Sequence, residues 1–151
     1  AQYVFLKAPV FALSSAVLTA SASDNENPQS VGNAKIVMNI TAQGGSDIYI
    51  RPASTSLKIV QGTTTVASTS AFTCTSGAFT SGNDYRIPAG NTAVCELNGV
   101  IQLTASTQNG FYQVQVATTT WSTDSNFASS VVTQGWGWDN FKTGLTNLIH
   151  K

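Results

Sequence analysis

The chain has 151 residues, of which 9% are charged, and its seven basic and seven acidic side chains cancel to a net charge of zero. This length predicts one domain with a sizeable core, and the neutral composition excludes the basic surface that attracts nucleic acids or anionic membranes. An average soluble domain has about 25% charged residues, so Ser, Thr, Asn and Gln must form most of the polar surface. Such a surface repels its own copies only weakly, which suits a secreted protein or one that packs against itself.

The N-terminal run at 3–20, YVFLKAPVFALSSAVLTA, is apolar but interrupted by Lys7, Pro9 and two serines. These interruptions exclude a membrane span, which needs about 20 apolar residues. Proline within a strand pattern indicates an edge or a junction. We therefore expect 1–22 to be either a first strand or an arm that adds a strand to a neighbouring subunit, with the main domain at 23–151. In the arm interpretation, the subunit contacts are Tyr3, Phe5, Val10, Phe11, Leu13, Val17 and Leu18.

Period-two alternation of apolar and polar residues predicts strands through most of the remaining chain. In the segment 34–43, for example, Ile36, Met38 and Ile40 share one face. Turn signals between such segments predict an all-β fold, namely an antiparallel β-sandwich, with a barrel as the alternative. Other strand candidates are 56–61 and 63–69, a hairpin around Gly62; 91–106, with a bulge candidate at 98–99; and 111–121.

The last third of the chain is less regular. The segment 119–133 has no clear period and is predicted to be a long connection with one short strand. The segment 138–149 has a weak helix signal at Asp139, but Gly144 interrupts it, so a closing strand is favoured.

Cys74 and Cys95 are the two cysteines. An even number in a chain poor in charge favours one disulfide in an oxidising compartment, with two separate buried thiols as the alternative. His150 is the single histidine, so an ordinary zinc site is excluded, because it needs three or four His or Cys ligands.

Catalytic constellations are missing from the sequence pattern. The seven carboxylates are spread over turns and strand ends without a convincing pair, His150 lies at the chain end, and no phosphate-binding glycine loop is present. The acidic segment 24–27, DNEN, lacks the full calcium-loop pattern and is read as a polar turn. We therefore predict no enzyme activity, metal or cofactor. Asn39 begins a formal glycosylation sequon on the outward face of its strand.

The tryptophans are the binding candidates. Trp136 and Trp138 lie two residues apart in QGWGWDNF, 134–141, so both indoles share a face if this segment is a regular strand. Together with Trp121 and Asp139 they could form a platform on which a sugar stacks. The alternative is that they fill the core or a subunit contact, since an indole buries about 150–250 Å². We favour the second.

The order of several segments resembles the immunoglobulin-like domains found in large surface proteins of Patescibacteria-type bacteria. The matching stretches are 38–50, which ends in GGSDIYI; 87–97, a proline and glycine turn followed by a strand; and the strand GFYQVQV at 110–116. The resemblance spans nearly the whole chain. It implies an immunoglobulin-like sandwich in an extracellular, non-enzymatic setting.

The favoured function is therefore an extracellular structural protein, secreted or at the cell surface. It would be a module of a surface protein or a self-assembling, pilus-like filament subunit joined by β-strand complementation. Its partners would be its own copies or other domains of a surface protein. A carbohydrate-binding module that uses the tryptophans is the alternative, with glycans as partners.

Overall fold

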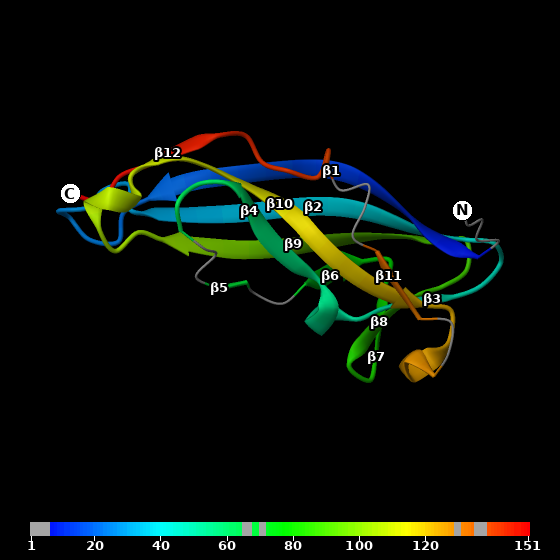
Figure 1. Ribbon diagram of the computed structural model, residues 1–151. Coiled ribbons are helices and arrows are strands. Elements are labelled where there is room, and N and C mark those ends of the chain that lie inside the picture. Colours follow the sequence, from blue (N-terminus) through cyan, green and yellow to red (C-terminus); the bar gives the residue numbers. More distant parts are fainter. Residues whose placement is uncertain (1–6, 65–67, 70–71, 129–130, 135–138) are drawn as a thin grey trace.

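The computed structural model describes residues 7–64, 68–69, 72–128, 131–134 and 139–151. It confirms the predicted all-β fold: two antiparallel sheets pack as a sandwich (Figure 1). In the described ranges the helices are three short 3₁₀ turns, η1 (Pro52–Ser54), η2 (Ser106–Gln108) and η3 (Ser125–Phe127).

The first sheet is built on a long antiparallel ladder. Its strands are β1 (Ala8–Ser21), β2 (Val31–Gln43), β9 (Thr92–Gln102), β5 (Ser68–Thr69) and β6 (Thr73–Ser76). β1 is at one edge and pairs with β2, β2 pairs with β9, and β5 and β6 both pair with β9. The division into an arm at 1–22 and a domain at 23–151 stays a prediction, but in this structure 8–21 lie beside β2 of the same chain.

The second sheet is organised around β10 (Gly110–Ser122), which has neighbours on both sides along its length. β12, β4 and β11 pair with successive parts of β10, and β3 pairs with its end. β8 then pairs with β3, and β7 pairs with β8. The bounds are β3 (Ile48–Ile50), β4 (Ser56–Gln61), β7 (Phe79–Ser81), β8 (Asp84–Ile87), β11 (Val132–Gln134) and β12 (Thr146–Leu148).

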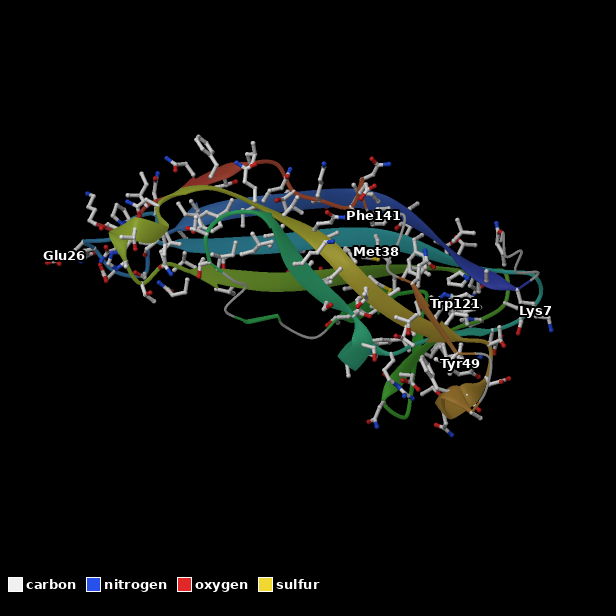
Figure 2. All side chains as sticks on the ribbon, viewed as in Figure 1. Lys7, Glu26, Met38, Tyr49, Trp121 and Phe141 are labelled. Carbon is white, nitrogen blue, oxygen red and sulfur yellow. A yellow bond between two sulfur atoms is a disulfide. The ribbon has the colours of Figure 1, made fainter. Side chains whose placement is uncertain are left out.

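The core lies between the two sheets and uses the predicted alternation. Ile36, Met38 and Ile40 of β2 are fully buried, and Figure 2 shows Met38 between the layers. Tyr112 and Val114 of β10 face them from the second sheet and are also buried. Burial of each aliphatic side chain among them contributes about 1.5–3 kcal/mol of gross transfer free energy. This contribution determines which face of each long strand points toward the core.

Two sequence predictions about local pairing are wrong. The hairpin around Gly62 does not form, because β4 pairs with β10 in the second sheet whereas β5 pairs with β9 in the first. The bulge at 98–99 is also absent, since β9 keeps an unbroken register with β2 there. A register shift lies instead between Leu13 and Ser15 of β1.

Gly62, which follows β4, allows the backbone to pass close to the buried ring of Tyr112. Its φ is +138°, a value that favours glycine, and a Cβ at this position would overlap the ring of Tyr112. The glycine therefore serves a crossing between sheets rather than a hairpin turn.

The predicted disulfide is confirmed. Cys74 of β6 and Cys95 of β9 are register partners and are bonded, with a sequence separation of 21. Cys95 is fully buried and Cys74 half-buried. The bond fixes the short strand β6 to the main ladder.

Gly62→Ala is expected to destabilise the fold more than Gly110→Ala. Gly110 has a similar φ of +149° but open space around its added Cβ, so its cost is backbone strain of about 1–2 kcal/mol. Gly62→Ala adds overlap with Tyr112 of about 1–3 kcal/mol. Urea unfolding of both variants measures the difference, and equal losses would contradict the close packing of Gly62.

Removing the disulfide is expected to lower the free energy of unfolding by about 3 kcal/mol in the chain-entropy model. The double variant Cys74→Ala/Cys95→Ala and the reduced wild type should agree within error in urea unfolding. An unchanged midpoint in both would show that the bond adds no stability.

Candidate functional site

The residues predicted for the subunit-contact arm divide between the two faces of β1. Val10, Leu13 and Val17 are 43%, 38% and 52% exposed, whereas Leu18 is buried and Phe11 partly buried against the core. Tyr3 and Phe5 lie outside the described residues. β1 has no charged residue between Ala8 and Ser21, so it lacks the charges that natural edge strands use against edge-to-edge association.

The C-terminal segment closes the sandwich beside β1. The hydroxyl of Thr146 donates to the carbonyl of Leu18 at 2.8 Å, so the Leu18 peptide points away from β2. Thr143 donates its N–H to the Val114 carbonyl at 2.8 Å, and Val116 donates to the Phe141 carbonyl at 3.0 Å. The favoured closing strand is thus present in part as β12, preceded by a segment bonded to β10. In Figure 1, β12 lies along one end of β1.

The tryptophan platform loses one of its predicted members. Trp121 is 2% exposed and belongs to the core cluster, so its indole offers no free face to a sugar. Its position on β10 turns it inward, in register with Ile50 of β3. Trp136 and Trp138 lie outside the described residues, and Asp139 is exposed. A glycan platform at these two indoles stays a prediction.

The segment 24–27 forms the polar turn that the sequence indicated. One oxygen of Asp24 accepts from the N–H groups of Glu26 and Asn27, both at 2.8 Å, and from the Asn27 side chain at 2.9 Å. The hydrogen bond from Asn27 is the main reason why the pKa of Asp24 lies below its ordinary value. Within the described residues no group of three His, Cys, Asp or Glu side chains is placed to hold a metal ion.

Asn39 lies on the outer face of the first sheet, where it is half-buried between its register partners Ala12 and Val94.

None of the helices in the described ranges has the length and apolar character needed to cross a membrane.

A cluster that the sequence analysis did not single out lies on the outer face of the second sheet. Tyr49 of β3 pairs in register with Arg86 of β8, and Arg86 pairs with Phe79 of β7. We call these three side chains the arginine–aromatic row. Since Ile48 and Ile50 are buried, alternation places Tyr49 on the outward face, and Figure 2 shows it at the β3 end of the molecule, near β7 and β8.

Arg86 is held in place within the row. Its Nη1 donates to Asp47 at 3.1 Å, and its guanidinium lies 5.4 Å from the centroid of the Phe79 ring. The other oxygen of Asp47 accepts from the Ala89 N–H at 3.0 Å. This backbone hydrogen bond, followed by that from Arg86, holds the pKa of Asp47 below 3.8. Arg86 is therefore positioned between a carboxylate and an aromatic ring.

The second arginine of the chain repeats this arrangement beside the row. Arg51 donates to both oxygens of the buried Asp84, at 2.9 and 3.2 Å, and lies 4.0 Å above the ring of Phe127. Hydrogen bonding to Asp84 raises the pKa of Arg51. Asn126 and Phe127 have φ values of 57° and 54°, strain that persists only when the surroundings determine it. Here that strained turn carries the Phe127 ring onto Arg51.

The sequence contained a signal for this cluster. Every second position is polar or aromatic at Asp47, Tyr49 and Arg51, and again at Asp84 and Arg86. Each of these two segments therefore displays its polar and aromatic side chains on one face. The alternation was visible, but the pairing that brings the strands together was not.

Comparisons with protein families, curated proteins and solved structures find no match. The assignment of function therefore depends on the geometry of the chain itself.

The stability contributed by Asp47 is expected to depend on pH. Because the folded-state pKa is depressed, the contribution is complete above the unfolded value near 3.8 and is lost as pH falls through the lower folded value. Asp47→Asn should thus lower Tm at pH 7, and its difference from wild type should shrink below pH 3.8. The exposed Asp139→Asn serves as control, and a Tm gap for Asp47→Asn that does not change with pH would contradict the ion pair.

Proposed function

We propose that this chain is a non-enzymatic structural protein of the extracellular surface, with an immunoglobulin-like sandwich, whose copies assemble by β-strand complementation. In this assembly 8–21 of one copy occupy the edge beside β2 of the next. The observation that carries the proposal is the position of β1: an uncharged edge strand near the N-terminus whose described strand partner is β2 alone.

The contacts of β1 are of a kind that a second copy can reproduce. Thirteen register pairs join β1 to β2, from Ala8 with Gln43 to Ser21 with Val31. Its inward side chains, such as Ala16 and Leu18, pack on the same core that β2 lines. An identical segment from a neighbour would make identical contacts, which is why exchange of a terminal element is a low-cost route to assembly.

The link between β1 and β2 determines whether exchange occurs. It contains the turn closed by Asp24, together with a hydrogen bond at 2.6 Å between the hydroxyls of Ser23 and Ser30. For β1 to leave its own sheet, these exposed or partly buried bonds must open, each contributing about 1 kcal/mol, together with the thirteen β1–β2 pairs and the bond from Thr146 to Leu18. The thirteen pairs reform with β2 of the next copy, so the net cost of exchange is that of the bonds that do not reform.

Two further features support the proposal, one its extracellular setting and the other the assembly of copies. The disulfide between Cys74 and Cys95 suits an oxidising compartment. The zero net charge leaves little long-range repulsion between copies at high local concentration.

A cysteine pair placed across β1 and β2 tests the exchange. Ala12 and Asn39 are register partners on the outer face. Ala12→Cys/Asn39→Cys, oxidised after assembly at high protein concentration, should give covalent ladders on a non-reducing gel, because β1 of one copy then faces β2 of another. Electron microscopy of the same sample should show filaments.

The matched control joins β2 to β9 instead. Thr41 and Thr92 are also register partners, and Thr41→Cys/Thr92→Cys should give intrachain bonds alone in the same sample. If the Ala12 and Asn39 pair gives monomer bands alone, each chain keeps its own β1 and strand exchange is wrong.

A further inference from the structure

We propose that the arginine–aromatic row, Phe79, Arg86 and Tyr49, binds a neutral glycan. This surface lies on the second sheet, whereas β1 lies in the first, so the inference is independent of assembly through β1. It also uses none of the residues of the predicted tryptophan platform.

The row presents an apolar face beside unused hydrogen-bonding groups. Phe79 is 55% exposed, so its ring can stack against the C–H face of a sugar. Arg86 has five N–H donors, and within the described residues it gives one of them, to Asp47. The hydroxyl of Tyr49 makes no hydrogen bond to the described part of the chain. Sugar hydroxyls can accept from Arg86 and both accept from and donate to Tyr49.

The spacing of the row fits an extended ligand. The three side chains stand on adjacent strands in register, and adjacent strands are about 4.8 Å apart, so the row spans roughly 10 Å. That is the length scale of a disaccharide lying across the strands. The surface is therefore suited to a stretch of polysaccharide chain.

The charge balance favours a neutral ligand over an anionic one. The row and its neighbours contain two arginines, Arg51 and Arg86, and two aspartates, Asp84 and Asp47, each arginine being paired with one aspartate. The sum is zero, and a ligand carboxylate or sulfate would have to compete with Asp47 for Arg86. Neutral hydroxyl groups can use the remaining N–H groups without breaking that pair.

The site is also preorganised. Arg86 is fixed by Asp47, which is itself fixed by the Ala89 N–H. A side chain already held in place loses little conformational entropy when a ligand binds.

Affinity gel electrophoresis with laminarin, xyloglucan, galactomannan and hydroxyethylcellulose, against alginate and heparin, tests the proposal. The wild-type chain should be retarded by at least one neutral polysaccharide. Phe79→Ala should raise the Kd for that polysaccharide about fivefold or more. The reason is that the free energy of one aromatic stack corresponds to a change in affinity of up to about tenfold. Arg86→Lys should also weaken binding, because lysine keeps the charge but loses the planar fork.

Phe111→Ala is the matched control, since Phe111 is 56% exposed and stands on β10 outside the row. It should bind as wild type does, and Tm of every variant verifies folding. Lack of retardation by all four neutral polysaccharides overturns the proposal, as does preferential binding of alginate or heparin. An equal loss in Phe111→Ala overturns the location.

Discussion

The ladder of β2 with its two neighbours is the constraint on which the rest of the structure depends. β2 pairs with β1 on one side and β9 on the other, and its inward residues Ile36, Met38 and Ile40 form the centre of the core. Because side chains alternate with period two, a slip of one residue would bring Lys35 and Asn39 into that core. The apolar face thus fixes the register of both neighbours, and through β9 the place of the disulfide.

The edge position of β1 follows from this ladder. β2 needs a partner on its outer side to satisfy its peptide groups, and the N-terminal strand supplies it. The C-terminal segment then reaches the second half of β1 through the bond from Thr146 to Leu18. In the structure the chain fills this edge with its own β1, and in the proposed assembly a neighbour would fill it through the same contacts.

The second sheet has a different character. Its short strands β3 and β8 bury Ile48, Ile50 and Ile87. Together with β7 they also place both arginines of the chain, each with an aspartate and a phenylalanine, on one outer face. The Arg86–Asp47 pair is partly exposed, where an ion pair contributes about 0–1 kcal/mol, whereas Asp84 of the Arg51 pair is buried. Their concentration on one face of a chain with 9% charged residues is the observation on which the proposed glycan site depends.

The all-β class, the long strands and the disulfide could be predicted from the sequence. Alternation along 34–43 and the count of two cysteines depend on local pattern and composition alone. The partner of β4, the burial of Trp121 and the register shift in β1 could not, since each depends on which distant strand packs alongside. For the same reason the candidate site was predicted at tryptophans, whereas the row was found only after β3, β7 and β8 were paired.

The sequence by itself determined two-faced strands, a neutral polar surface and one covalent cross-link, because these are properties of residue order and residue type. Only the tertiary structure decided that Gly62 lies against Tyr112 at a crossing between sheets, that the chain end closes the sandwich beside β1, and that Tyr49, Arg86 and Phe79 form one row. Those arrangements require contacts between residues far apart in the chain, and their free energy depends on packing that no local pattern contains.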